Sequence, residues 1–320
     1  MEKNERNIKM WSTIGPRATV GIVAYELAKK IENLMVLTCD VSTSAGLDRY
    51  RKSYPNKYLD LGIAEQNMIG VAAGLASENY NVVTTTFAPF QTMRCCEQIK
   101  VNLGYMKQKV TMIGIASGLV LGTLGYTHCC IEDIGVLRSI PNLTIVSPAD
   151  SLETAKALEE LINYEHPAYL RITGSSNNPI VYKKDYDFSI GKSITIKEGK
   201  DITIFCTGSM VYQSMEASKF LEKENISAKV VNIHTIKPID KKAILDSCKS
   251  KMIVTVEEHN IIGGLGSAVS EVVSTVKNSP KQLFLGLKDT YSKGGNYNYL
   301  KEKFRLTPKM ICEDIKKNLI

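Results

Sequence analysis

The chain has 320 residues, which predicts about two domains, and 44% of them are hydrophobic, so the sequence can supply a sizeable core. Its net charge of +7 comes largely from scattered lysines, and the basic runs are short and lack interleaved aromatic residues, a pattern that argues against nucleic-acid binding. No stretch is long and apolar enough to cross a membrane, and the charged N-terminus lacks the apolar segment of a signal peptide.

The eight cysteines indicate a reducing compartment. They include the adjacent pairs Cys95–Cys96 and Cys129–Cys130, and no two cysteines have C-x-x-C spacing. Neighbouring cysteines on a helix point in different directions, so neither a zinc site nor a disulfide framework is indicated. We therefore predict a cytoplasmic protein.

Strands and helices are predicted to alternate through the first half of the chain. Residues 1–12 are expected to form a loose polar arm around Trp11, 17–31 an amphipathic helix, and 40–53 a polar, turn-like segment. Apolar runs typical of buried strands lie at 34–39, 58–61, 81–87, 109–115, 143–146 and 168–172. Helices are predicted from Gly62 to Ser77, at 89–103, before Pro141, and at 151–163.

A second alternation follows a polar segment with few helix signals. Its strands are predicted at 202–206, 228–233, 251–256 and 282–287, and its helices after Ser209 and at 240–248, 267–276 and 307–319. Such alternation implies parallel sheets covered on both sides. The predicted fold is α/β with two domains, each a mostly parallel sheet with helices on both faces. The domains are residues 12–175 and a smaller domain at 201–320, joined by a linker at 176–200.

The helix after Gly62 carries one carboxylate, Glu65, in its first turn. An acid there is ordinarily a solvated charge that favours the helix dipole, and for Glu65 alone this interpretation is favoured. The helix is almost free of charge and rich in small residues, so we expect it to be buried on most faces, with another backbone close to it. The small residues are Gly70, Ala72, Ala73, Gly74 and Ala76. A buried carboxylate needs a specific partner.

Three further clusters contain residues suited to chemistry. Phe87 and Phe90 lie at a strand-to-helix turn; such aromatics are usually core, but they could also form a flat wall for a heteroaromatic ring. His128 follows a glycine-rich loop without phosphate-binding spacing; a single histidine is more often structural, although imidazole suits proton transfer. Residues 257–260 precede glycines that lack the G-x-G-x-x-G spacing, which favours a structural turn over a nucleotide site.

Taken in order, these clusters resemble the pyrimidine-binding domain of thiamine-diphosphate enzymes of the transketolase family. The resemblance is carried by DLGIAEQNM, TFAPF and GYTHCCIEDIGVLRSIPN. Two later segments, KPID and EEHNIIGGLG, are similar to the C-terminal domain of that family. The family includes transketolases, deoxyxylulose-phosphate synthases and the β subunits of 2-oxo-acid dehydrogenases, and the resemblance extends over residues 12–320.

The resemblance implies a role for each cluster. Glu65 would hydrogen-bond the ring nitrogen N1′ of the aminopyrimidine of thiamine diphosphate and so favour the imino tautomer that generates the reactive C2 ylid. Phe90 would stack on the pyrimidine, and Phe87 and Ile63 would also contact the cofactor. His128 would face the substrate carbonyl and its developing alkoxide.

The resemblance also concerns the substrate. It places Asp40 and Ser44 on a loop near cofactor and substrate, and it leaves Arg17 as the one plausible contact for a phosphate. Family positions that bind sugar or phosphate groups have changed: an acidic residue to Leu124, a histidine to Ala116, and an arginine to Thr173 or Gly174. We therefore predict weak or no preference for ordinary sugar phosphates, and an unphosphorylated or larger modified sugar as substrate.

One motif of the family is missing from the sequence. Members with a complete chain carry an upstream domain with a G-D-G…N motif that holds Mg²⁺ and the diphosphate, and this sequence has no G-D-G. The resemblance implies the C-terminal subunit of a split transketolase, which holds no metal itself and shares its site with an N-terminal subunit in an α₂β₂ heterotetramer. Alternatives that stay open are a 2-oxo-acid dehydrogenase β subunit, a deoxyxylulose-phosphate-synthase-like enzyme, and a non-catalytic binding subunit.

Overall fold

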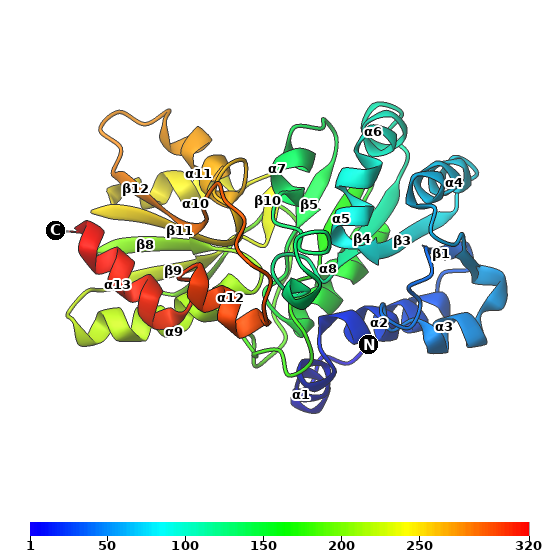
Figure 1. The fold of residues 1–320 in the computed structure, drawn as a ribbon, viewed down its shortest axis with the longest axis horizontal. Helices are drawn as coiled ribbons and strands as arrows, with labels where there is room; N and C mark the ends of the chain where they lie inside the picture. The colour runs from blue at the N-terminus through cyan, green and yellow to red at the C-terminus, as the bar shows by residue number, and fades with distance from the viewer. Residues whose placement is uncertain (320) are drawn as a thin grey trace.

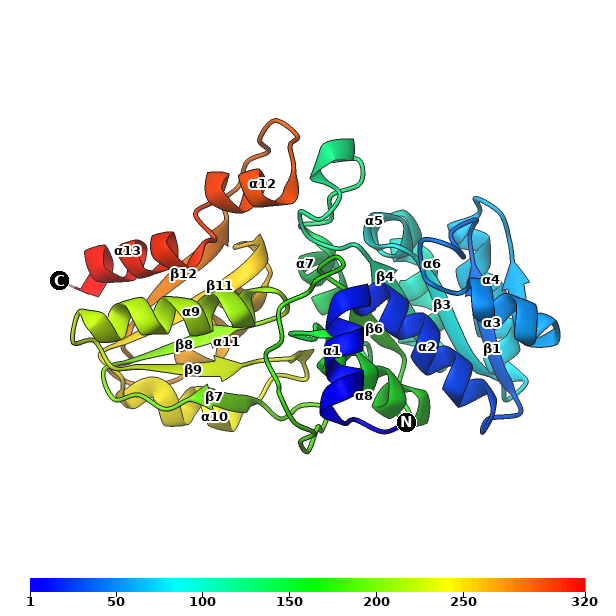
Figure 2. The same cartoon turned by 90° about the horizontal axis from the view of Figure 1, so that it is seen from below.

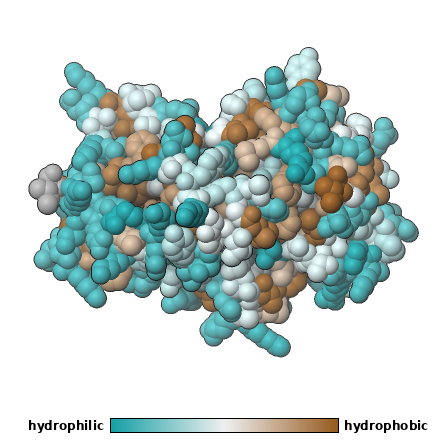
Figure 3. Space-filling model, viewed as in Figure 1, coloured by the Kyte–Doolittle hydropathy of each residue, from teal (hydrophilic) through white to brown (hydrophobic). Residues whose placement is uncertain are grey.

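The computed structural model describes residues 1–319 and contains two sheets that lie side by side, each flanked by helices (Figure 1). A hollow separates the two halves at the top of the face shown in Figure 3. Within the described residues, no helix is both long enough and apolar enough to span a membrane.

The first sheet has seven strands in the order β10-β5-β6-β4-β3-β1-β2. Their bounds are β1 Leu34–Thr38, β2 Tyr58–Asp60, β3 Asn81–Phe87, β4 Val110–Ile115, β5 Thr144–Val146, β6 Ala168–Arg171 and β10 Thr235–Lys237. Neighbouring strands are parallel except for β10 and β5, which pair antiparallel. Because β10 comes from the second half of the chain, both halves contribute to this sheet.

Helices cover both faces of the first sheet. Their bounds are α1 Glu5–Ile14, α2 Pro16–Ala28, α3 Asp48–Ser53, α4 Glu65–Ser77, α5 Ala88–Gln91, α6 Cys96–Gln98, α7 Asp133–Arg138 and α8 Ser151–Asn163. Short turns add η1 Pro55–Lys57, η2 Met93–Cys95, the π-helix η3 Ile99–Tyr105 and η4 Gly122–Leu124. Successive residues of a strand point to opposite faces, so Met112 packs in the cluster of α4 and Ile113 in that of α2 and α8.

The second sheet has five strands in the order β12-β11-β8-β9-β7. Its elements are β7 Ile194–Lys197, β8 Ile202–Cys206, α9 Met210–Lys223, β9 Ala228–Asn232, α10 Lys241–Asp246, η5 Ser247–Lys249, β11 Met252–Asn260, α11 Leu265–Val273, β12 Lys281–Leu287, α12 Tyr297–Lys303 and α13 Pro308–Leu319. Helices α9 and α13 cover one face, and α10 and α11 the other. The predicted α/β fold with two mostly parallel sheets is confirmed.

The two halves also share a hydrophobic core. One cluster contains Met68 of α4 and Met112 of β4 together with Phe205 of β8 and Leu265 of α11. All four side chains are fully buried. The second half is therefore packed against the first sheet and is more than an appended domain.

Several sequence expectations were wrong in detail. Residues 1–12 are not a loose arm, because Asn4 caps α1 through Asn7 N, and Ile8 and Trp11 are buried on one side of the helix. The segment expected to be turn-like contains α3, and the expected linker ends in β7, which pairs antiparallel with β9. Residues 257–260 extend strand β11, and the expected turn follows at residues 261–264, before α11.

Two helices also differ from expectation. The helix predicted at 89–103 is interrupted at Thr92, which separates α5 from η2 and whose hydroxyl donates to the carbonyl of Ala88. Helix α4 is buried on one face only, and a Cβ on Gly70 or Gly74 would meet nothing within 4 Å. No backbone of the described chain therefore packs against the small residues on that face.

Candidate active site

Glu65 begins α4 and is only 4% exposed. Its Oε2 accepts a 2.8 Å hydrogen bond from Nη1 of Arg94, which is 42% exposed. Within the described residues, Oε1 has no hydrogen-bond partner. The carboxylate thus has one protein partner and one oxygen available to another group.

Asp60 connects two backbone turns near Glu65 through hydrogen bonds. It was not among the site residues predicted from the sequence. Its Oδ1 accepts the backbone amides of Asp40 at 2.9 Å and of Gly62 at 3.0 Å. The pKa of Asp60 lies below its ordinary value. Burial raises this pKa, but hydrogen bonds from the two amides and from Thr38 and Tyr58 outweigh the effect of burial. Gly62 has a φ of +66°, so the turn that leads into α4 uses a backbone conformation that favours glycine.

An aromatic cluster lies next to Glu65. The guanidinium carbon of Arg94 is 4.0 Å from the centroid of the Phe90 ring. The ring of His128 is 5.3 Å from that of Phe90 and 6.3 Å from that of Phe87, both in edge-to-face geometry. The structure therefore brings Glu65, Phe87, Phe90 and His128 together, with Arg94 between the acid and the rings.

His128 lies in a loop between β4 and α7, and the second half of the chain holds this loop. Leu119 N donates to Oε1 of Glu258 on β11 at 2.7 Å, and Gly295 N donates to the carbonyl of Gly122 at 3.0 Å. Gly118 has a φ of +69°, and a Cβ there would clash with the Glu258 carboxylate. Figure 2 shows α12 next to this loop.

Two tyrosines form further contacts between the loop that carries His128 and the second half of the chain. The ring centroids of Tyr126 and Tyr291 are 4.9 Å apart, and Tyr291 donates to Oε1 of Glu132 at 3.0 Å. The hydroxyls of Tyr126 and Ser292 are also 3.0 Å apart. The segment between β12 and α12 therefore helps to position His128.

A buried ion pair lies beneath the same loop. Nε of Arg171 donates to Oδ2 of Asp133 at 2.8 Å, and both side chains are almost fully buried. Arg171 also donates to the carbonyls of Cys130 and Glu258, so it joins the loop to strand β11. Truncating one partner of such a pair leaves an uncompensated buried charge. Arg171 therefore has a structural role between the two halves.

Glu257, beside Glu258 on β11, does not belong to a nucleotide site. Its carboxylate accepts the amides of Leu265 at 2.6 Å and Gly266 at 2.8 Å, at the start of α11. Burial raises the pKa of Glu257 to about 7, although these two hydrogen bonds lower it. A Cβ on Gly264 would clash with the Glu257 carboxylate, so the glycine there allows close packing of strand and helix.

The other residues singled out from the sequence lie around this centre. Ile63 is 76% exposed in the turn before α4, and Asp40 is exposed with a φ of +56° at the end of β1. Ser44 is exposed in a loop whose Gly46 packs against the backbone of Arg17 and Ala18. Neither Ser44 nor Arg17 forms a hydrogen bond or ion pair with Glu65 or His128 within the described residues.

The positions at which the family pattern is lost carry no charge. Leu124 is 57% exposed in η4, close along the chain to His128. Ala116 and Thr173 are buried, and the Thr173 hydroxyl is 2.6 Å from that of Ser117. Arg17 is half-buried, and burial lowers its pKa. Within the described residues it has no acidic partner.

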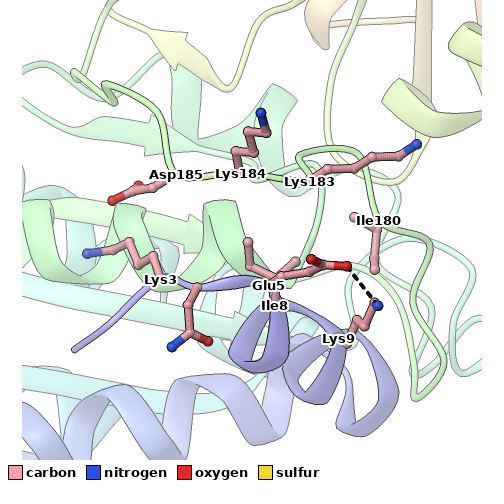
Figure 4. A pocket seen from close by; sticks show the side chains of 9 residues that line it. Lys3, Glu5, Ile8, Lys9, Ile180, Lys183, Lys184 and Asp185 are labelled. Atoms are coloured by element: carbon pink, nitrogen blue, oxygen red, sulfur yellow. Dashed lines mark ion pairs between the residues drawn. The ribbon is translucent and has the colours of Figure 1, made fainter.

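A separate surface pocket of about 670 Å³ lies between α1 and residues 180–185 (Figure 4). Its charged side chains include the exposed pair Glu5–Lys9, with a separation of 2.8 Å. The lining residues are Lys3, Asn4, Glu5, Ile8, Lys9, Ile180, Lys183, Lys184 and Asp185. None of them is a candidate site residue.

Within residues 1–319, no group of three or more His, Cys, Asp or Glu side chains could hold a metal ion.

The chain thus combines two packed α/β halves with a buried glutamate that lies beside an aromatic cluster. Residues 13–178 match the family model "Transketolase, pyrimidine binding domain", and residues 191–311 match "Transketolase, C-terminal domain". The chain therefore belongs to the transketolase family, whose members are thiamine-diphosphate-dependent transferases.

Relatives of similar length support this assignment. A "Putative transketolase C-terminal section" of Methanocaldococcus jannaschii is 36% identical over 95% of this chain and 97% of that protein. The "6-deoxy-6-sulfo-D-fructose transketolase subunit SqwH" of a Clostridium species is 36% identical over 89% of this chain and 88% of its own length. One of the subunits of the apulose-4-phosphate transketolase of Phocaeicola vulgatus is 35% identical over 90% and 92%.

A solved structure has the same fold and extent. The structure "Split gene transketolase, inactive beta4 tetramer" superposes with a TM-score of 0.86 at 34% identity and covers 96% of this chain and 98% of that chain. A transketolase from Campylobacter jejuni has the same fold, with a TM-score of 0.79 at 20% identity over 95% of this chain and 47% of that chain. This chain thus corresponds to the C-terminal subunit of a split transketolase.

Proposed function

We propose that this subunit binds the aminopyrimidine half of thiamine diphosphate and, with an N-terminal partner, transfers a two-carbon ketol unit from a ketose to an aldehyde. The observation that carries this proposal is the arrangement of Glu65, which is 4% exposed, beside Phe90 and His128. A buried carboxylate needs a specific partner, and a flat nitrogen heterocycle stacked on Phe90 supplies one.

The residues present fit that half of the cofactor. Glu65 has one oxygen without a protein partner within the described residues, and Phe90 and Phe87 offer aromatic surface next to it. Ile63 and Asp40 lie on the two turns that Asp60 joins, so both can approach the same ring. Thiamine diphosphate, when bound, supplies the nucleophilic carbon and the electron sink of the reaction.

The chain's own residues position and polarise the reactants. Glu65 orients the ring and holds a proton at the nitrogen it faces, and the buried setting strengthens that hydrogen bond. His128 donates a hydrogen bond to the substrate oxygen on which negative charge develops. Thr127 Oγ1 lies 3.0 Å from His128 Nδ1, which leaves Nε2 available to the substrate.

The diphosphate and Mg²⁺ are assigned to the partner subunit. Two relatives that this chain spans almost completely are themselves subunits of transketolases, which supports an enzyme of two chains. We propose an α₂β₂ heterotetramer with the active sites between the subunits. All eight cysteines are free thiols, which supports a cytoplasmic location.

Calorimetry tests the shared site. Thiamine diphosphate with Mg²⁺ is titrated into this chain alone, into the pair with its N-terminal subunit, and into the pair with Glu65→Gln. We expect binding by the wild-type pair, weaker binding by the variant pair and none by the chain alone. Tight binding by the chain alone would refute a shared site, and absence of binding by the pair would refute the proposed function.

The class of substrate is inferred from positions near His128 that bind sugar or phosphate groups in family members and carry no charge in this chain. Leu124, Ala116 and Thr173 cannot form the charge-assisted bonds that family members make, each of which contributes about 1.5–3 kcal/mol. Arg17 remains a candidate contact for an anionic group, and Ser44 lies on the loop that packs against its backbone. We therefore propose weak or no preference for standard pentose and hexose phosphates, and an unphosphorylated or modified sugar as substrate.

Kinetics with a panel of donors and acceptors tests this proposal. We expect kcat/KM on xylulose 5-phosphate and ribose 5-phosphate to be well below that on the preferred pair of sugars. Arg17→Ala should raise KM for an anionic substrate and leave KM for a neutral one unchanged. Rates on the two standard phosphates equal to those of a common transketolase would contradict the proposal.

A further inference from the structure

Arg94 makes two contacts at the centre of the site. Its Nη1 donates to Glu65 Oε2 at 2.8 Å, and its guanidinium carbon lies 4.0 Å from the Phe90 ring centroid. A guanidinium is planar, carries N–H donors on its edge and stacks on aromatic faces. An aminopyrimidine is likewise flat and nitrogen-rich, and it too can stack on Phe90 and hydrogen-bond Glu65.

We propose that Arg94 holds the place of the aminopyrimidine in the cofactor-free subunit and is displaced when thiamine diphosphate binds. This inference rests on the function proposed above, which places the aminopyrimidine against the same carboxylate and the same Phe90 ring. The other aromatic neighbours of Phe90 approach it edge-to-face, His128 at 5.3 Å and Phe87 at 6.4 Å. Among these neighbours, Arg94 is the one whose planar group lies over a face of the Phe90 ring, where a heterocycle would also stack.

The side chain of Arg94 can leave without unfolding its surroundings. Its backbone carbonyl accepts a 3.0 Å hydrogen bond from Nε2 of Gln66 on α4, so the backbone is anchored. The side chain itself is 42% exposed. An ion pair with one half-exposed member contributes little to stability, so its exchange for a ligand contact is readily reversible.

The place-holder gives Glu65 a partner before the cofactor arrives. Glu65 is nearly inaccessible to water, and an isolated carboxylate there would be costly. With Arg94 in place the charge is compensated. The apparent affinity for the cofactor is then lowered by the fraction of molecules in which Arg94 occupies the ring site.

Calorimetry on the reconstituted pair, with thiamine diphosphate and Mg²⁺, measures this competition. Arg94→Ala and Arg94→Met remove the guanidinium, and both should lower the apparent Kd about two- to fivefold. Arg49→Ala is the matched control, because Arg49 also lies 4.0 Å from an aromatic centroid, that of Tyr25, and the affinity of this variant should not change. The rise in Tm on saturation with cofactor should be larger for both Arg94 variants than for the wild type.

The results of this titration distinguish failure of the Arg94 inference from failure of the proposed function. If the wild-type pair binds and both Arg94 variants bind equally or more weakly, Arg94 stays beside Glu65 in the loaded enzyme and the place-holder is refuted. If the wild-type pair does not bind, the proposed function fails and this inference fails with it. Agreement between the Ala and Met variants excludes an effect of side-chain volume alone.

Discussion

At the scale of single residues, the proposed chemistry depends most on Glu65. Glu65→Gln keeps the size of the side chain but changes its hydrogen-bonding to the ring nitrogen. We expect kcat of the reconstituted pair to fall by at least about 10²-fold, the usual contribution of a positioned acid or base. Steady-state ketol-transfer assays measure the effect. Glu78→Gln, at the exposed C-terminal end of the same helix, is the control.

An unchanged rate for Glu65→Gln would favour a subunit that keeps the fold without taking part in catalysis. The Tm and the assembly of the variant should be recorded beside the rate. A variant that fails to assemble says nothing about chemistry, whereas a fully assembled and active variant removes the proposed role of this carboxylate.

His128 is the second residue with a predicted catalytic effect. His128→Ala removes a donor to the developing alkoxide, and we expect kcat to decrease by about 10²–10³-fold with a small change in KM. His166→Ala is a matched control, because His166 also lies edge-to-face with an aromatic ring, Tyr164, on a different loop. A large rise in KM with unchanged kcat would assign His128 to substrate binding only.

The proximity of four residues could be predicted, because Glu65, Phe87, Phe90 and His128 each lie in a motif of the sequence. Arg94 could not, since its position depends on the break in the helix at Thr92, which no propensity indicates. Asp60 could have been found, because an aspartate two residues before a glycine commonly hydrogen-bonds the glycine amide.

At the scale of elements, the loop that carries His128 is held from the second half of the chain. Tyr291→Ala removes the contact with Tyr126 and the hydrogen bond to Glu132, and we expect a two- to tenfold loss of kcat/KM, about the effect of one aromatic pair. Tyr291→Phe keeps the ring contact and should recover most of the loss. Tyr105→Ala, an exposed tyrosine of η3, is the control.

Full activity of Tyr291→Ala would mean that the loop is positioned by Glu258 and the backbone contact of Gly122 alone. A change in kcat/KM without a change in Tm would separate positioning from general stability. Both kcat/KM and Tm should therefore be measured on the same preparation of each variant.

His234, between β9 and β10, makes the fold sensitive to acid. Burial lowers its pKa from 6.5 to about 4, and the imidazole stacks on Phe188 with centroids 4.3 Å apart. The unfolded chain binds a proton between these two values and the folded chain does not. Stability is therefore complete above about pH 6.5 and decreases as the pH falls toward 4.

His234→Phe removes the contribution of His234 to this pH dependence and keeps a ring against Phe188. At pH 5 we expect the variant to lose about 2 kcal/mol less of its unfolding free energy than the wild type, relative to pH 7.5. Urea unfolding at both pH values measures the difference. His166→Phe controls for the loss of one imidazole. Parallel loss of stability in wild type and His234→Phe would contradict the prediction.

Element types were largely predictable, since buried parallel strands are continuous apolar runs, and β8 and α8 were predicted with the observed bounds. Short elements were missed. β10 has three residues and pairs with a strand far away in sequence, so nothing local specifies it. Helix α1 was missed because its polar composition hides the spacing of Ile8 and Trp11, which is helical only once Asn4 caps the chain.

At the scale of the whole molecule, the two halves are packed together and depend on shared elements. They share a hydrophobic cluster, a buried Arg171–Asp133 pair that reaches β11, and strand β10. We expect residues 1–200 expressed alone to aggregate, because β5 would then present an unpaired edge and part of the core would be exposed. Size-exclusion chromatography with full-length chain as control measures this, and a soluble, monomeric fragment would contradict it.

The pairing of β10 with β5 also limits how members of the family can be recombined. A chimera that joins the first half of this chain to the second half of a relative receives a foreign strand within its own first sheet. The register that such a hybrid must reproduce is Thr235 opposite Val146 and Lys237 opposite Ile145. A junction chosen in the polar segment near residue 190 looks modular in the sequence, yet it cuts through a structural dependence between the two pieces.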